Sequence, residues 1–205
     1  YSASRRGAIY EERAPYDMKV LVVGNGGREH AIAWKLKQSP NVDSIVVAPG
    51  NAGTAAIAEN VMIAPTDLDS LLEYAMEETV DLTVIGPEAP LADGIADRFQ
   101  EAGLAVFGPT AAAARIETSK SFAKELMERH KIPTGSAEIF DEFDEAKRYL
   151  RDCEIPVAVK ANGLAGGKGV VTAQTREEAE CALRRFMLKK EFGDAGGRVL
   201  IEEFL

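Results

Sequence analysis

The sequence lacks three features, and each absence excludes a class of protein. No run approaches the roughly 18 apolar residues of a membrane-spanning helix. Two cysteines, Cys153 and Cys181, share no motif spacing, so we expect free thiols in a reducing compartment such as the cytoplasm. The 24 basic residues are outnumbered by 33 acidic ones, which gives a formal net charge of −9. This acidic excess argues against a general nucleic-acid or membrane surface, although it permits a local basic pocket.

What is present is an ordinary globular composition, 46% hydrophobic and 28% charged. The length of 205 residues allows one large domain or two small ones. Residues 1–17 do not begin with Met and show no apolar period, whereas Met18 directly precedes the first apolar run. We expect 1–17 to be a disordered extension, a cloning remnant or upstream read-through, with a trimmed transit peptide as the alternative.

From residue 19 onward, short apolar runs alternate with segments of helical periodicity. The expected strands are 19–23, 44–48, 81–85 and 104–107. The expected helices are 28–38, 67–78 and 90–102. Apolar strands separated by helices form right-handed βαβ units, so the sequence predicts an α/β fold with an open, parallel, Rossmann-like sheet.

Each expected strand of this sheet ends in a glycine or proline turn, at 24–27, 49–54, 86–88 and 108–110. Ligands of open parallel sheets bind beyond the carboxyl ends of the strands. Four turns on one edge therefore indicate a single pocket, although an α/β fold also needs turns there simply to connect its elements.

After residue 110 the pattern changes, and a domain boundary is expected at 110–120. The expected elements that follow are a helix at 118–131, a strand at 137–140, an acidic helix at 142–152, strands at 157–160 and 169–173 around a glycine loop, a helix at 175–189 and a strand at 198–204. We divide the chain into domains at 18–118 and 119–205. Because the second stops directly after a strand, we expect it to be incomplete.

The segment 18–31, MKVLVVGNGGREHA, is typical of an anion site, because a strand breaks into glycines and then opens a helix. A dinucleotide fingerprint would place a third glycine where Glu29 stands and an acid at the end of the second strand, where none occurs. Both departures weaken a nicotinamide or flavin interpretation. Instead, Arg28 could pair with a phosphate as a fork. Glu29 could cap the helix or bind a substrate hydroxyl or amine, and His30 could pack or contact a ligand.

A second motif is the segment 160–170, KANGLAGGKGV, which contains four glycines and two lysines and connects two strands. It is not a Walker loop, because Gly169 follows Lys168 where a hydroxyl residue would be needed. Such a loop can fold over a triphosphate while lysines hold the charge, or it can be a mobile surface hairpin with solvated lysines. The terminal segment IEEFL is a weaker signal for a strand that lines a base pocket.

Together these motifs resemble glycinamide ribonucleotide synthetase, or phosphoribosylamine–glycine ligase, of the ATP-grasp superfamily. The resemblance runs collinearly from Met18 to Leu205 and includes VLVVGNGGREHA, VAPGNAGT, DLTVIGPEAPL, VKANGLAGGKGV and IEEFL. It implies ATP-dependent ligation of glycine to 5-phosphoribosylamine, an early step of purine synthesis, with ATP and Mg²⁺ as cofactors. It also implies a cytoplasmic enzyme; the oligomeric state is open, and we favour a monomer.

The resemblance also implies two sets of site residues. The phosphoribosylamine pocket would comprise Gly24, Asn25, Gly26, Gly27, Arg28, Glu29, Asn51, Gly53, Gly86, Pro87 and Glu88. The ATP site would comprise Lys120, Lys160, Gly163, Gly166, Gly167, Lys168, Gly169, Glu202, Phe204 and Leu205.

This sequence departs from the family pattern in composition and in length. Asn162 stands where Asp is usual, and Gly166 where Ala is common; an amide keeps the hydrogen-bonding shape but loses the charge. The family continues for roughly as many residues again, and the metal-ligand motif lies in that part. We therefore assign no catalytic or metal-binding residue and expect residues 18–205 to be inactive alone.

Three alternatives stay open at this point. The chain could belong to another ATP-grasp ligase of purine synthesis or to a biotin carboxylase relative, although GNGGREH and PGNAGT argue against both. It could be a non-catalytic module that binds a phosphosugar or nucleotide. A nicotinamide dehydrogenase is the weakest alternative.

Overall fold

The computed structural model describes residues 17–205 and divides into two compact units. The first unit comprises the described residues up to 90 together with residues 95–108. The second unit comprises residues 91–94 and 109–205. The expected extension at 1–17 lies outside the described residues except for Asp17, which is exposed and in no helix or strand. Within the described part, no helix is long and apolar enough to cross a membrane.

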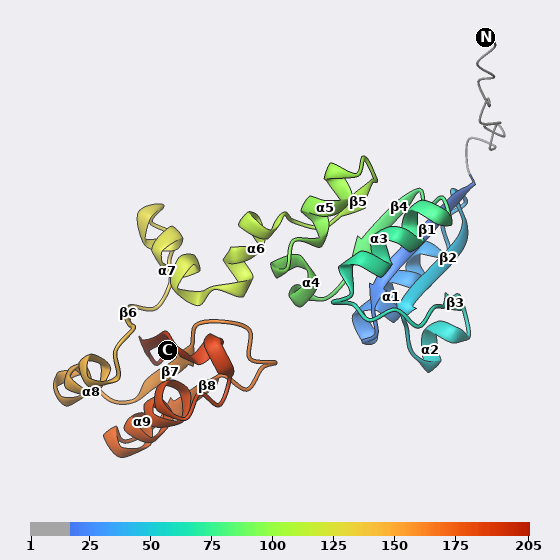
Figure 1. The fold of residues 1–205 in the computed structure, drawn as a ribbon. Helices are drawn as coiled ribbons and strands as arrows, with labels where there is room; N and C mark the ends of the chain where they lie inside the picture. Colours follow the sequence, from blue (N-terminus) through green and yellow to red (C-terminus); the bar gives the residue numbers. More distant parts are fainter. Residues whose placement is uncertain (1–16) are drawn as a thin grey trace, which may run out of the picture. The chain divides into compact units, whose positions relative to one another are not determined.

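The first unit is built on a parallel sheet, as predicted. Its strand order is β3-β2-β1-β4-β5, and every adjacent pair is parallel. The strands are β1 (Met18–Gly24), β2 (Val42–Pro49), β3 (Glu59–Asn60), β4 (Leu82–Ile85) and β5 (Val106–Phe107) (Figure 1). The order reverses between β1 and β4, which is where doubly wound sheets open a crevice for ligands.

Burial explains why these runs form strands. Residues 20–23 of β1 are completely buried, which is expected of a central strand covered on both faces. On one face, Val20, Val22 and Val47 pack with Ala33 of α1 (Gly27–Leu36). The other regular helices of this unit are α2 (Ala52–Ala55), α3 (Leu68–Glu77) and α5 (Ile95–Glu101).

The single helix predicted at 90–102 is wrong, because the structure has two helices there. The segment α4 (Glu88–Ala92) ends before α5 begins at Ile95. Between them Gly94 has φ +85°, a left-handed conformation that a continuous right-handed helix cannot contain.

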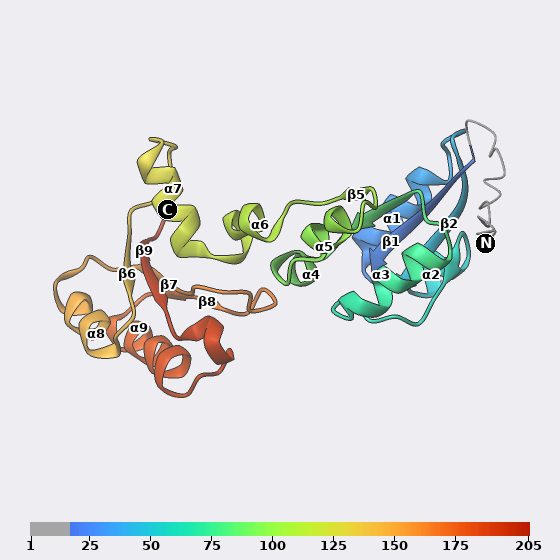
Figure 2. The same ribbon diagram turned by 45° about the horizontal axis from the view of Figure 1, so that its top comes forward.

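The second unit contains an antiparallel sheet of order β6-β9-β7-β8. Its strands are β6 (Ala137–Phe140), β7 (Val157–Ala161), β8 (Val170–Ala173) and β9 (Val199–Glu203). Figure 2 shows β7 and β8 side by side, with the glycine loop as the hairpin between them. The helices are α6 (Ala111–Thr118), α7 (Lys120–Arg129), α8 (Phe143–Asp152) and α9 (Arg176–Leu183), and α9 continues as a π-helix (Arg184–Leu188) before a 3₁₀ turn (Gly193–Gly196).

The helix predicted at 118–131 corresponds to α7, and α6 was missed. Ser119 separates the two helices because its extended backbone ends α6, while its hydroxyl accepts from the Phe122 N–H at the start of α7. Thr110 caps α6 in the same way, through the Ala113 N–H.

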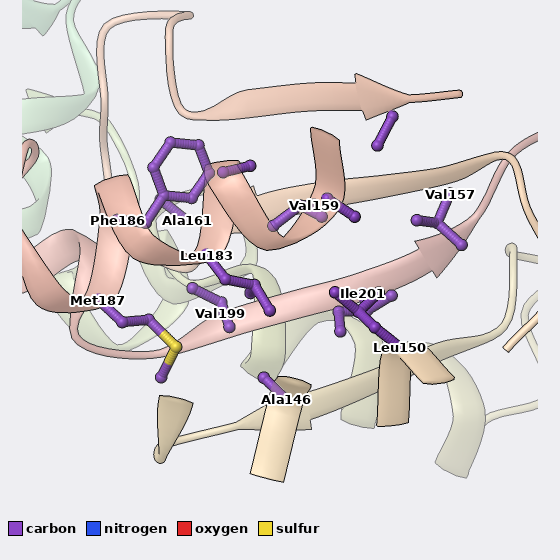
Figure 3. Close-up of a cluster of buried hydrophobic side chains, with 13 residues drawn as sticks. Ala146, Leu150, Val157, Val159, Ala161, Leu183, Phe186, Met187, Val199 and Ile201 are labelled. Atoms are coloured by element: carbon purple, nitrogen blue, oxygen red, sulfur yellow. The ribbon is translucent and has the colours of Figure 1, made fainter. Parts of the chain in front are cut away.

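The core of the second unit lies between its sheet and the helices α8 and α9 (Figure 3). Alternate strand residues, such as Val157, Val159 and Ile201, point toward these helices and meet Leu150 and Leu183. The same alternation places Lys160 and Glu202 on the opposite face of the sheet.

Candidate functional site

The turns after β1, β2 and β4 meet at the carboxyl edge of the first sheet. The Gly50 N–H donates to the Gly24 carbonyl at 3.1 Å, and the Gly86 N–H donates to the Val23 carbonyl at 3.0 Å. The Asn51 side chain donates to the carbonyls of Asn25 and Gly26 at 3.0 and 3.2 Å. The structure therefore brings three of the four predicted turns into one hydrogen-bonded group.

Glu29 is the buried carboxylate of this group, with only 3% of the residue exposed. Its Oε2 accepts from the Gly26 N–H at 2.6 Å, so Glu29 caps the start of α1. The first backbone hydrogen bond of α1 runs from the His30 N–H to the Gly26 carbonyl. The N–H groups of residues 27–29 precede this bond and lie at the positive end of the helix dipole. Of the two roles left open for Glu29, the structure shows the cap.

Glu29 also accounts for two of the strand-end glycines. A Cβ on Gly24 would lie 2.6 Å from Glu29 Cδ, and a Cβ on Gly86 would lie 2.0 Å from Glu29 Oε1. Gly24 has φ +130° as well, which disfavours any other residue. The glycines at the switch point between β1 and β4 thus make room for a side chain of this chain.

Arg28, the predicted phosphate fork, is held by two carboxylates. Its Nε donates to Glu29 Oε1 at 2.9 Å and its Nη1 to Glu88 Oε1 at 3.0 Å. These hydrogen bonds raise the pKa of Arg28, and the bond from Arg28 lowers the pKa of Glu88. About half of the Arg28 side chain stays exposed, so it can be reached from solvent.

Asn51 serves as scaffolding in this structure. Its Oδ1 accepts from the N–H groups of Gly53 and Thr54, which caps α2, while its Nδ2 holds the first loop. Asn60, which sequence reasoning missed, bonds to the Asn51 carbonyl and to the Thr54 hydroxyl. The ring of His30 lies against Gly53, where a Cβ would come within 2.6 Å of it, so the packing role is the one seen.

The second candidate site is a cavity of about 320 Å³ in the second unit. It brings together Lys120 from α7, Lys160 from β7 and Glu202 from β9, all predicted. The other lining residues are Ala123, Lys124, Met127, Thr134 and Val170. Sequence reasoning missed Lys124, although its spacing of four residues from Lys120 places it on the same face of α7.

Glu202 forms ion pairs with two of these lysines. Its Oε1 accepts from Lys124 at 2.8 Å and its Oε2 lies 2.6 Å from Lys160 Nζ. Burial raises the pKa of Glu202, but the hydrogen bonds from Lys124 and Lys160 outweigh it and leave the pKa below its ordinary value. Lys124 also donates to Thr134 Oγ1 and to the Gly135 carbonyl, so it is bonded to three acceptors.

Lys120 has no carboxylate partner at bonding distance among the described residues; its Nζ donates to the Gly163 carbonyl at 3.2 Å. Burial lowers its pKa, Glu117 acts in the opposite direction, and the positive charge of Lys160 lowers it further. A cation with a lowered pKa next to another cation is suited to bind an anion.

The glycine loop, residues 162–169, joins the antiparallel strands β7 and β8 as a hairpin. Gly166 and Gly167 have φ +55° and +76°, which the turn requires. Gly163 and Gly169 instead allow close approach, since a Cβ on either would lie within 2.8 Å of an alanine Cβ. Lys168 lies exposed on this loop and does not line the 320 Å³ cavity.

The last two predicted nucleotide residues lie apart from the lysines. Phe204 follows β9 and lines a different cavity of about 380 Å³, near Tyr149 and Pro156. Leu205 is 88% exposed. Along the described residues, 17–205, no group of three or more His, Cys, Asp or Glu side chains is placed to hold a metal ion.

Comparison with protein families matches the whole described region except its first residue. Residues 18–117 match the model of the phosphoribosylglycinamide synthetase N domain, and residues 118–205 match its ATP-grasp (A) domain. The phosphoribosylamine–glycine ligases of Escherichia coli O6:H1 (strain CFT073) and Haemophilus influenzae are 56% and 53% identical over 190 residues. That stretch is 92% of this chain and 44% of each relative, so the chain spans less than half the length of these relatives.

Solved structures agree with the sequence matches. The phosphoribosylamine–glycine ligase of Thermotoga maritima superposes with a TM-score of 0.72 at 30% identity, over 92% of this chain and 44% of that one. The biotin carboxylase domain of Hydrogenobacter thermophilus 2-oxoglutarate carboxylase, solved with MgADP, has a TM-score of 0.73 at 21% identity, over 91% and 44% of the two chains. This second likeness shows the fold alone. Because two consecutive domain models of one family cover residues 18–205, the chain belongs to the phosphoribosylglycinamide synthetase family.

Proposed function

We propose that residues 18–118 form the phosphoribosylamine-binding domain, and residues 119–205 part of the ATP-grasp domain, of a phosphoribosylamine–glycine ligase. The observation that carries the proposal is the 56% identity to a ligase of that name over 190 residues, together with family models that cover both candidate sites. The enzyme would join glycine to 5-phosphoribosylamine at the expense of ATP, in the cytoplasm, giving glycinamide ribonucleotide, ADP and phosphate.

The chemistry of that reaction defines what the chain must bind. The carboxylate of glycine takes the γ-phosphoryl group of ATP, and the amine of phosphoribosylamine then displaces phosphate. Both the phosphosugar and the nucleotide carry phosphate groups, and each unit supplies cationic or N–H donors for one of them.

In the first unit, the start of α1 would receive the 5-phosphate of the sugar. The N–H groups of residues 27–29 and the exposed half of Arg28 are the donors there. Gly24–Gly27, Asn51, Gly53 and Gly86–Glu88 would shape the pocket, with Glu29 and Asn51 acting mainly through the hydrogen bonds that hold the loops together.

In the second unit, Lys120 and Lys160 would hold the ATP phosphates, and Glu202–Leu205 would lie along the base. The loop Gly163–Gly169 would cover the phosphates from the β7–β8 hairpin. Magnesium would neutralise phosphate charge during transfer. We assign magnesium no ligand from this chain, because the resemblance places the metal-ligand motif in a part of the family that residues 18–205 do not span.

Calorimetry on this chain with ribose 5-phosphate and with ADP tests the two sites separately. Arg28→Ala should weaken ribose 5-phosphate binding at least tenfold and leave ADP binding unchanged, whereas Lys160→Ala should do the reverse. Lys147→Ala, which removes a lysine paired with Glu180 outside both sites, is the matched control and should change neither. Failure of the unmodified chain to bind either ligand would refute the proposal.

A further inference from the structure

Asn162 lies at the junction between the segments that carry Lys120 and Lys160, two of the three lysines that line the 320 Å³ cavity. It directly follows β7, two residues after Lys160. Its backbone carbonyl accepts from the Lys120 N–H at 3.0 Å, and its own N–H donates to the Arg198 carbonyl at 3.0 Å. Asn162 therefore joins three segments: the start of α7, the end of β7 and the approach to β9.

The side chain of Asn162 strengthens the connection to α7. Its Oδ1 accepts from the Ser121 N–H at 2.8 Å, and the Ser119 hydroxyl lies 3.4 Å away. Ser121 is 2% exposed, so its N–H would be left without a partner in a buried place if this acceptor were lost. The amide thus supplies a capping acceptor to α7 from a residue 41 positions further along the chain.

This connection opposes an electrostatic cost. Lys120 and Lys160 line the same cavity, and Lys160 is also paired with Glu202. Burial is the main cause that lowers the pKa of Lys120, and the charge of Lys160 lowers it further. Two cations that face one cavity repel each other and gain by separating, so elements that carry them need a fixed link. Among the described contacts, Asn162 is the residue that bonds directly to the N–H groups of both Lys120 and Ser121 and is covalently two residues from Lys160.

We infer that Asn162 is a positioning residue, which sets the separation of Lys120 and Lys160 and thereby the affinity of the cavity for a polyphosphate. The inference rests on the proposed nucleotide site. Asn162 does not itself need to touch the ligand, because it acts through the start of α7.

The test compares ADP with adenosine, which lacks phosphates, by ligand-observed NMR on this chain. Asn162→Ala should weaken ADP binding at least tenfold and change adenosine binding by less than twofold. Asn162→Asp retains the acceptor oxygen and should recover most of the ADP affinity. Faster amide hydrogen exchange at Ser121 in Asn162→Ala, but not in Asn162→Asp, would report the loosened link without any ligand.

Thr175→Ala is the matched control, since it removes a side-chain cap from α9 in the same unit but from a helix without a cavity lysine. It should lower stability and leave the ratio of ADP to adenosine affinity unchanged. Unchanged ADP affinity in Asn162→Ala, or equal losses for ADP and adenosine, would overturn the inference. If the unmodified chain bound neither ADP nor adenosine, both the proposed nucleotide site and this inference would be refuted. That failure is distinguishable from failure of the inference alone, because it is seen in the unmodified chain before any substitution is made.

Discussion

At the residue scale, Thr83 is a buried polar residue with an unpaired side-chain oxygen. The residue is 1% exposed in β4, and its Oγ1 has no hydrogen-bond partner among the described residues. A buried hydroxyl without a partner has lost its bonds to water without compensation.

We expect Thr83→Val to stabilise the first unit by about 1 kcal/mol, because the valine has the same shape and no unsatisfied hydroxyl. The measurement is the midpoint of urea unfolding. Thr172→Val, at an exposed position of β8, is the control and should change stability little. A destabilised Thr83→Val would indicate that the hydroxyl is bonded in solution.

Gly86 and Glu29 form a pair whose coupling can be measured. Gly86→Ala places a methyl group 2.0 Å from Glu29 Oε1, so the carboxylate must move and the bond to the Gly26 N–H breaks. We expect a loss of about 1–3 kcal/mol for Gly86→Ala alone. Because Glu29→Ala vacates that space, the double variant should lose clearly less than the sum of the single variants in a double-mutant cycle. Additive losses would contradict the described contact.

The residue scale is also where sequence reasoning was least complete. The motif around Gly24 indicated an anion site but left two roles open for Glu29. The structure shows that Glu29 caps the helix through the Gly26 N–H and that its carboxylate packs against Gly86, in the turn after β4. Asn51 and Lys124 differ in whether the sequence alone could have revealed their contacts. The bonds of Asn51 to the first loop depend on tertiary structure, whereas Lys124 could have been found from its spacing to Lys120 alone.

At the scale of elements, Glu202 connects β9 to α7 and β7 through its two lysines. Its pKa in the folded protein lies below the ordinary value near 4.5, so the pairing contributes stability above that pH and loses it as the pH falls through the lowered pKa. We expect Glu202→Gln to cost about 1.5–3 kcal/mol at pH 7, and the difference from the unmodified chain to shrink below pH 4.

Urea unfolding at a series of pH values checks this prediction. Glu191→Gln, which removes an exposed carboxylate paired with Arg185, is the control and should leave the pH profile nearly unchanged. A constant difference between Glu202→Gln and the unmodified chain from pH 7 to pH 3 would contradict the assignment.

Elements were predicted best where burial alone decides them. The strands of both sheets follow from apolar runs, except β3 (Glu59–Asn60), a polar pair at the edge of the first sheet that was not predicted. The parallel sheet follows from the alternation of the predicted strands with helices. The break at Gly94 and the separate helix α6 were missed. Each depends on the backbone conformation of a single residue, Gly94 or Ser119, which hydrophobic periodicity does not predict.

At the scale of the whole molecule, the two units have separate hydrophobic cores. We therefore expect two unfolding transitions, which calorimetry can resolve. Leu71→Ala should lower the transition temperature of the first unit, and Leu183→Ala that of the second. Each substitution should reduce the free energy of unfolding of its unit by about 2–5 kcal/mol, since both side chains are completely buried. If either substitution lowered both transitions equally, the units would be folding as one.

The arrangement around Arg28 has a consequence for any phosphate that reaches α1. Arg28 already pairs with both Glu29 and Glu88, so one positive charge faces two carboxylates. An incoming anion must take the guanidinium away from a carboxylate, and binding becomes an exchange of partners. The binding free energy would then be the small difference between the free energies of two similar ion pairs. Because added salt weakens both pairs, it would change this affinity less than it changes the affinity of an unpaired arginine for phosphate.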